Sequence, residues 1–188
     1  LLECEYLAQV GNDFLVKNTA LTQLECPNLV QVGDNFLLEN KALTKLECPN
    51  LIKTGDYFLN WYDGLSQICF PNLIQVRNGF LGCNKSLIYF ECPNLIQVGN
   101  GFINANEIMT QLKCPKLTQV GYDFLYNNTE LVQLEFPNLT HVNSGFLNNN
   151  TKLSHLDCPK LTDIGILPLI NNPHLAETIT NNANGRSR

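Results

Sequence analysis

The chain repeats itself every 22 residues, and this regularity limits its possible folds more than any other feature of the sequence. The segments "LTQLECPNLVQVGDNFL" (residues 21–37) and "LTKLECPNLIKTGDYFL" (residues 43–59) are two of the copies, and no insertion interrupts the step. The consensus is L-x-x-L-x-C-P-N-L-x-x-V-G-x-x-F-L-x-x-N-x-x. A short, fixed period of this kind predicts a solenoid, in which each turn of the chain packs only on its neighbours.

The first part of each repeat predicts a β-strand. In Leu-x-x-Leu-x-Cys the apolar residues point into the coil and the x residues point outward, because side chains alternate along a strand. The following Pro ends the strand. Stacked turns therefore predict a parallel sheet with strands about 4.8 Å apart. The Cys position is held by Cys4, Cys26, Cys48, Cys92, Cys114 and Cys158, with Phe70 and Phe136 in the other two turns.

The second part of each repeat predicts the return path to the next strand. Val32-Gly33 ends a second short extended piece, where Gly can adopt a positive φ. Residues 36–40 are expected to form a helical turn that packs Phe36 into the core. The last consensus residue predicts an inward ladder of amides that satisfy buried backbone groups. This ladder is Asn18, Asn40, Asn84, Asn106, Asn128, Asn150 and Asn172.

The pattern carried by Leu43, Leu46 and Cys48 resembles the leucine-rich repeat family. The Pro after the strand, the Val-Gly pair and the aromatic residue resemble its BspA-like, or Treponema-type, branch over residues 2–180. The resemblance implies a repeat solenoid with a parallel β-sheet on the concave face and short strands or helical turns on the other side. It also implies protein binding, which in this branch commonly means cell-surface adhesion or host interaction. We expect one domain of about eight repeats at residues 1–180, beginning in mid-repeat, and a polar tail at residues 181–188.

The eight cysteines are expected to be free thiols. Cysteines in register on neighbouring strands lie about 4.8 Å apart, whereas a disulfide needs a Cβ–Cβ distance near 3.8 Å. Cys69 and Cys83 lie off the row and are expected to be more exposed. Free thiols favour the cytoplasm or another reducing setting, whereas the resemblance allows the cell surface.

The outward residue before each Cys forms a row that carries the net charge of the chain. The row reads Glu3, Glu25, Glu47, Cys69, Glu91, Lys113, Glu135 and Asp157. Six acids and one lysine give it a charge of −5, equal to the net charge of the whole chain. Like charges on adjacent strands repel. The pairs expected to do so without relief are Glu3–Glu25, Glu25–Glu47 and Glu135–Asp157.

Two interpretations of this acidic row remain open. It is either a groove for a cationic, Lys/Arg-rich partner, or a solvated face, copied with the repeat, that opposes aggregation. The aromatic residues of the third turn, Tyr57, Trp61 and Tyr62, indicate either a contact patch or local repacking of Tyr62 with Phe70. The residues predicted to bind a partner are Glu25, Glu47, Glu91, Glu135, Asp157, Tyr89 and Trp61.

These features favour a non-catalytic protein-interaction module; the alternative is a scaffold fragment of a longer repeat protein. The three histidines occupy different rows and form no triad-like arrangement, so we expect neither an enzyme nor a metal or cofactor site. The negative charge disfavours nucleic acid as a partner, and no apolar run reaches the ~20 residues needed for membrane insertion. An uncapped first coil, with Leu2 and Cys4, allows self-association.

Overall fold

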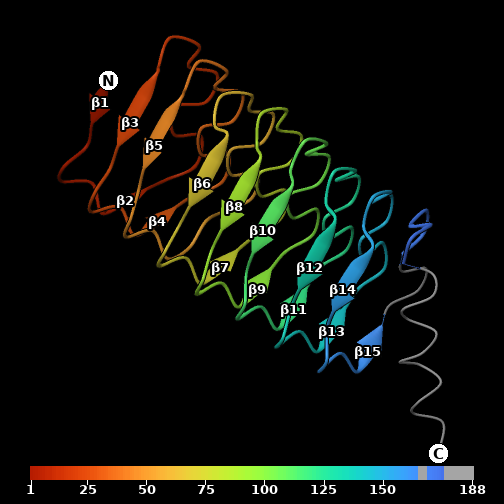
Figure 1. Cartoon of the computed structure of the whole chain (residues 1–188). Helices are drawn as coiled ribbons and strands as arrows, with labels where there is room; N and C mark the ends of the chain where they lie inside the picture. Colours follow the sequence, from red (N-terminus) through yellow and green to blue (C-terminus); the bar gives the residue numbers. More distant parts are fainter. Residues whose placement is uncertain (165–168, 176–188) are drawn as a thin grey trace, which may run out of the picture.

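The computed structural model describes residues 1–164 and 169–175, which form a parallel-strand solenoid (Figure 1). The predicted fold class is therefore confirmed. The residues predicted as a tail, 181–188, lie outside the described part of the chain.

Each turn contributes one strand to a first sheet, built from the Leu-x-x-Leu-x-Cys segments. Its strands are β1 (Leu2–Glu3), β3 (Gln23–Glu25), β5 (Lys45–Glu47), β6 (Gln67–Cys69), β8 (Tyr89–Glu91), β10 (Gln111–Lys113), β12 (Gln133–Glu135) and β14 (His155–Asp157). All pairings are parallel and join residues 22 apart, such as Glu25 and Glu47. The sheet consists of three paired groups, because β5 does not pair with β6, nor β10 with β12.

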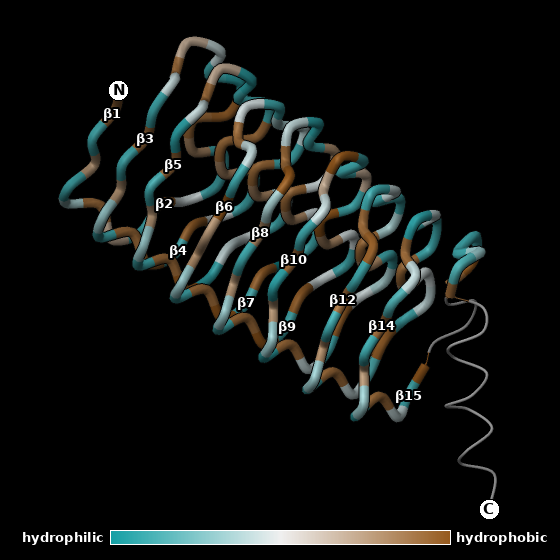
Figure 2. The backbone as a smooth tube through the Cα atoms, viewed as in Figure 1, coloured by the Kyte–Doolittle hydropathy of each residue, from teal (hydrophilic) through white to brown (hydrophobic). Residues whose placement is uncertain are grey.

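A second sheet is built from the residues around the Val-Gly pair. Its strands are β2 (Gln9–Val10), β4 (Gln31–Val32), β7 (Gln75–Val76), β9 (Gln97–Val98), β11 (Gln119–Val120), β13 (His141–Val142) and β15 (Asp163–Ile164). In the third turn Lys53 bridges Gln31 and Gln75 and so joins β4 to β7. The valines point inward and the polar residues before them point outward, an alternation visible as changing colour along each turn in Figure 2.

The third side of the solenoid differs from the prediction, because residues 36–40 do not form a helical turn and no described residue is helical. Here φ is positive at alternate residues, including Leu37 and Glu39. This alternation turns peptide groups sideways, toward the neighbouring turns. The Leu37 N–H donates to the preceding turn at the Phe14 carbonyl (3.0 Å), and the Glu39 N–H donates to the following turn at the Asn60 carbonyl (3.2 Å). The result is a third backbone ladder, which satisfies groups that a helix would have bonded along the chain.

Stacked aromatic rings fill the core beside this third ladder. The Phe36 and Phe58 rings lie 5.3 Å apart with an interplanar angle of 4°, and the stack is continued by the equivalent residues of neighbouring turns. Phe70, which replaces Cys, meets Phe58 edge-on at 5.7 Å. Both arrangements are favourable for aromatic pairs. All eight cysteines lie in the described residues and are free, with Cys26, Cys48, Cys92 and Cys114 buried.

The predicted amide ladder is confirmed for its six buried members, whereas Asn18 in the first turn is only partly buried. Asn128 is fully buried; its Nδ2 donates to the Ile103 carbonyl at 2.8 Å, and its Oδ1 accepts the Asn106 N–H at 3.1 Å. Tyr62 replaces Asn in the third turn and is 1% exposed, so it lies in the core rather than on a contact patch. Its hydroxyl has no hydrogen-bond partner, and burial raises the pKa of Tyr62.

Candidate functional site

The outward residues of the first sheet bring together all but one of the residues predicted to bind a partner. In the strand register Glu25 lies opposite both Glu3 and Glu47, and Glu135 lies opposite Asp157. Glu91 lies between Cys69 and Lys113. We call these outward side chains, from Glu3 to Asp157, the acidic row.

The expected unrelieved repulsion between Glu25 and Glu47 is wrong. The Lys45 ammonium lies 2.7 Å from Glu25 Oε1 and 2.9 Å from Glu47 Oε1, and it bridges the two carboxylates. The hydrogen bond to Glu25 and, to a smaller extent, the hydrogen bond to Glu47 raise the pKa of Lys45. Lys45 lies on β5, two residues before Glu47, and so belongs to the neighbouring outward row. Counting charges along the acidic row alone therefore does not reveal this ion pair.

Farther along the row the carboxylates have polar rather than cationic partners. The Tyr89 hydroxyl donates to Glu91 Oε2, and this bond raises the pKa of Tyr89 to about 12. The Gln133 amide donates to Glu135 Oε1 at 2.6 Å. Within the described chain no lysine or arginine lies in salt-bridge range of Glu91, Glu135 or Asp157. The C-terminal part of the row therefore keeps its negative charge.

A groove of about 530 Å³ opens on the first sheet where β10 and β12 fail to pair. Polar and charged side chains surround it, including Glu91, Gln111, Gln133 and Glu135, and Leu112 lies among the lining residues. Lys113 stands within the groove and places its ammonium 5.8 Å from the centre of the Tyr89 ring. The sequence carries a signal here, because Phe136 replaces Cys after β12, just as Phe70 replaces Cys after β6 at the other missing pairing.

Trp61 lies away from the acidic row. It belongs to the third ladder, where its N–H donates to the Gly82 carbonyl at 3.0 Å, whereas the acidic row lies on the strands of the first sheet (Figure 1). Its side chain is 59% exposed. The structure therefore separates Trp61 from the six other predicted residues.

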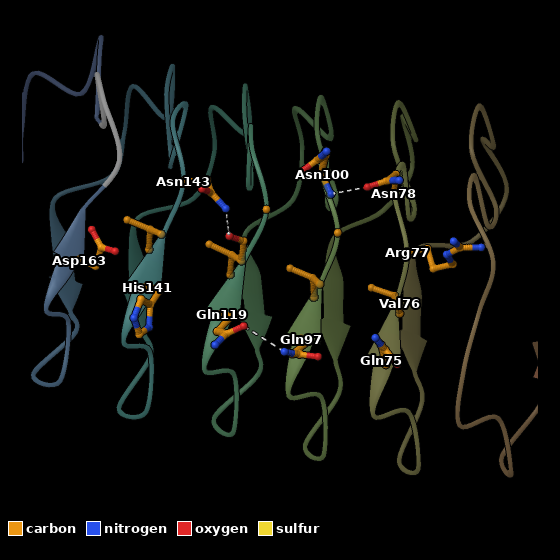
Figure 3. A pocket seen from close by; sticks show the side chains of 15 residues that line it. Gln75, Val76, Arg77, Asn78, Gln97, Asn100, Gln119, His141, Asn143 and Asp163 are labelled. Carbon is orange, nitrogen blue, oxygen red and sulfur yellow. Dashed lines mark hydrogen bonds between the residues drawn. The ribbon is translucent and has the colours of Figure 1, made fainter.

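The second sheet carries a groove of its own, of about 570 Å³, lined mainly by amide side chains (Figure 3). Gln97 donates to Gln119 at 3.0 Å, and the Asn100 N–H donates to Asn78 Oδ1 at 2.9 Å. Arg77 lies at one end, 3.8 Å from Asp56 Oδ1. Most of these amides bond to one another or to the backbone, so they stabilise the stacking of the turns.

Neither groove holds a cluster suited to metal binding. Among residues 1–164 and 169–175 no three His, Cys, Asp or Glu side chains gather in a way that could hold an ion. The buried thiols are poor nucleophiles, because burial raises the pKa of Cys92 and of Cys114. In the same residues no helix has the length and apolar character needed to cross a bilayer.

Comparison with known proteins agrees with this architecture. The chain superimposes on a leucine-rich repeat protein from Bacteroides ovatus with a TM-score of 0.62 and 19% identity, over 89% of this chain and 51% of that one. It superimposes on the leucine-rich repeat protein of T. pallidum with a TM-score of 0.60 and 12% identity, over 97% of this chain and 78% of that one. The chain thus spans about half the length of the Bacteroides protein. No curated protein matches the sequence.

A family model settles the classification. The model for the BspA type leucine-rich repeat region matches residues 5–101 and 77–183, which together cover nearly the whole chain. Leucine-rich repeat proteins are generally protein-interaction or scaffold modules. The chain belongs to the BspA-type leucine-rich repeat family.

Proposed function

We propose that this protein is a non-catalytic interaction module whose first sheet binds a basic segment of a protein partner. The observation that carries the proposal is the uncompensated C-terminal part of the acidic row. Glu135 and Asp157 lie opposite each other in the register, and no cationic side chain of the described chain neutralises them. Holding two like charges at this spacing costs stability, and a lysine or arginine from a partner removes that cost.

The contacts divide the predicted carboxylates into two groups, which differ in how strongly they would attract a partner's cation. Glu25 and Glu47 already share Lys45, so a partner's cation gains little from them. Glu91 and Glu135 border the groove between β10 and β12, and Asp157 lies on the adjacent strand. Lys113 stands in this groove, so a partner's basic side chain is expected at its β12–β14 edge, where the aliphatic stem packs and the charge meets Glu135 or Asp157. The binding centre is therefore assigned to β8–β14.

A matched pair of variants tests this assignment. A Lys/Arg-rich peptide library and a cell extract are exposed to the native chain, to a Glu91/Glu135/Asp157→Gln variant and to a Glu25/Glu47→Gln variant, at low and moderate salt. We expect the first variant to lose the bound peptides and proteins, the second to keep them, and moderate salt to weaken the native interaction.

Two results would count against the proposal. Equal retention by all three chains would make the acidic row a solvated face, and the scaffold function would then stand. Equal loss in both variants would show that the row acts through its total charge rather than through the groove.

A further inference from the structure

An uncharged patch with two exposed aromatic side chains lies on the third side of the solenoid. It contains Tyr57, Asn60 and Trp61 of the third turn, and small or amide residues occupy the same places in the next two turns. We call the whole set the aromatic patch: Tyr57, Asn60, Trp61, Gly79, Gly82, Cys83, Gly101, Asn104 and Ala105. The equivalent places in the first two turns carry charged residues, among them Asp13, Lys17 and Glu39.

The two aromatic residues stand where the backbone disfavours them. Tyr57 and Trp61 both have φ of 56°, and a left-handed conformation costs a bulky residue about 1 kcal/mol. At the Tyr57 place, the other described turns use only residues that tolerate this conformation: Asp13, Asn35, Gly79, Gly101, Asp123 and Gly145. The cost is not offset by burial, because Tyr57 is 49% exposed and Trp61 is 59% exposed. The third ladder imposes this φ on every turn, so the unusual feature is the choice of two exposed aromatic side chains at these places.

Neighbouring glycines fix the Tyr57 ring in place. A β-carbon built on Gly79 would lie 2.6 Å from Tyr57 Cδ1 and 3.3 Å from Asn60 Nδ2, so the ring and the amide lie side by side over the Gly79 backbone. The Trp61 N–H donates to Asn60 Oδ1 at 2.9 Å, which orients the amide. The Tyr57 ring and the Asn60 amide therefore pack over the backbone of the next turn.

The Asn60 amide also has an unused donor. Asn60 is 8% exposed, and its Nδ2 donates no hydrogen bond to any described residue, although its Oδ1 is occupied. This nitrogen is not fully enclosed, so it is free to donate to water or to a ligand. A ligand oxygen placed beside the Tyr57 ring can accept this bond, because the ring and the amide lie over the same glycine.

We propose that the aromatic patch binds a neutral oligosaccharide. The C–H face of a pyranose ring is weakly positive and stacks on the electron-rich face of an aromatic ring, and its hydroxyls both donate to and accept from amides such as Asn60 and Asn104. The absence of charge across the patch matches a neutral ligand rather than the basic partner assigned to the first sheet. Tyr122 and Tyr126 are also exposed; they lie three turns farther along the solenoid, a shift of about 14 Å, and one place earlier in the repeat than Tyr57 and Trp61. This distance suits an extended sugar chain.

The patch contains the only tryptophan of the protein, so binding can be read directly from its fluorescence. The probes are cellohexaose, maltohexaose, laminarihexaose and chitohexaose, titrated to millimolar concentration into the full chain. We expect at least one probe to shift the Trp61 emission saturably and to protect it from acrylamide quenching. Tyr57→Asn, which installs the residue found at this place in the second turn, is expected to weaken that binding about tenfold.

Controls separate this site from the acidic row. The Glu91/Glu135/Asp157→Gln variant is expected to bind the sugar as the native chain does, so failure of one proposal leaves the other standing. Calorimetry with Trp61→Ala confirms the loss where fluorescence is no longer available. Circular dichroism of both aromatic variants shows that the fold is kept. The proposal is overturned if no probe gives a saturable change, or if Tyr57→Asn and Trp61→Ala bind as tightly as the native chain.

Discussion

The Nζ of Lys45 lies 2.7 Å from Glu25 Oε1, and the same ammonium reaches the carboxylate of Glu47 on its own strand. One lysine thus neutralises a pair that the strand register forces together. Lys45→Gln, which installs the residue found at this place as Gln23 and Gln67, restores the repulsion. We expect its urea midpoint to fall below that of the native chain at low salt and to match it in molar salt, because exposed charges are screened there. If the urea midpoint of the variant stayed below that of the native chain in molar salt, Lys45 would act through packing rather than through its charge.

The pH dependence of the same pair has a defined sign. The folded chain raises the pKa of Lys45 above its ordinary value of 10.5, so the stabilisation is complete below that value and is lost as pH rises through the raised pKa. Denaturation curves at rising alkaline pH should therefore bring the native chain and Lys45→Gln together. A constant difference across that range would contradict the ion pair.

Asn128→Ala tests the amide ladder. The change removes three hydrogen bonds, one of them a long one to the Tyr126 carbonyl, and leaves the Asn106 N–H and the Ile103 carbonyl unpaired in the core. We expect the free energy of unfolding to fall by about 3 kcal/mol. Asn72→Ala, which loses one exposed bond to the Pro49 carbonyl, is the control and should cost about 0.5–1 kcal/mol. If denaturant titrations gave both variants the same loss in free energy of unfolding, burial would not be the source of the stability that the ladder provides.

Gly121→Ala tests how closely the turns approach. A β-carbon at residue 121 would lie 2.6 Å from the Gly99 carbonyl carbon and 2.7 Å from the Asn100 nitrogen, both backbone atoms of the preceding turn. We expect a loss of about 2 kcal/mol or more, because the turns must separate. Gly11 has nothing within 4 Å of the same position, so Gly11→Ala should change stability by less than about 0.5 kcal/mol. Thermal unfolding of the two variants checks the contrast.

Thiol labelling should follow exposure along the chain. Cys69 on β6 is exposed, whereas Cys92 and Cys114 are buried. We expect one fast-reacting thiol in the native protein, identified as Cys69 by mass spectrometry, and reaction of the buried thiols only on unfolding. Partial burial and the Glu91 charge raise the pKa of Cys69, so its labelling should quicken as pH rises through the alkaline range. Fast native labelling of Cys114 would indicate that the turns open locally.

The regular features of the fold could be predicted because each follows from a residue repeated at the same place. The inward cysteine row and the amide ladder needed only the 22-residue step and strand alternation. The helical turn at residues 36–40 was wrong because local propensity gives no warning of alternating φ. A signal was nevertheless present: Asp13, Asn35, Gly79 and Gly101 occupy one place, and all tolerate a left-handed backbone.

The surface was harder to predict than the core. Lys45 was counted in a different row from Glu25, although its long side chain reaches across to it. Trp61 was grouped with the acidic residues, but which side of a coil a residue faces depends on the backbone path of the turn. The groove between β10 and β12 arises from a missing strand pairing, and both missing pairings precede a turn in which Phe replaces Cys, at Phe70 and at Phe136.

The third ladder has the same backbone hydrogen bonds from one turn to the next. A leucine N–H donates to the phenylalanine carbonyl of the preceding turn, in the pairs Leu37–Phe14, Leu59–Phe36 and Leu81–Phe58. On this third side, each of these turns therefore offers its neighbours the same bonding partners. Recombination between misaligned copies of the gene, if it adds or removes 22 codons, leaves a chain whose turns still fit together. Such a protein can vary in length between strains while the spacing of its surface residues stays constant.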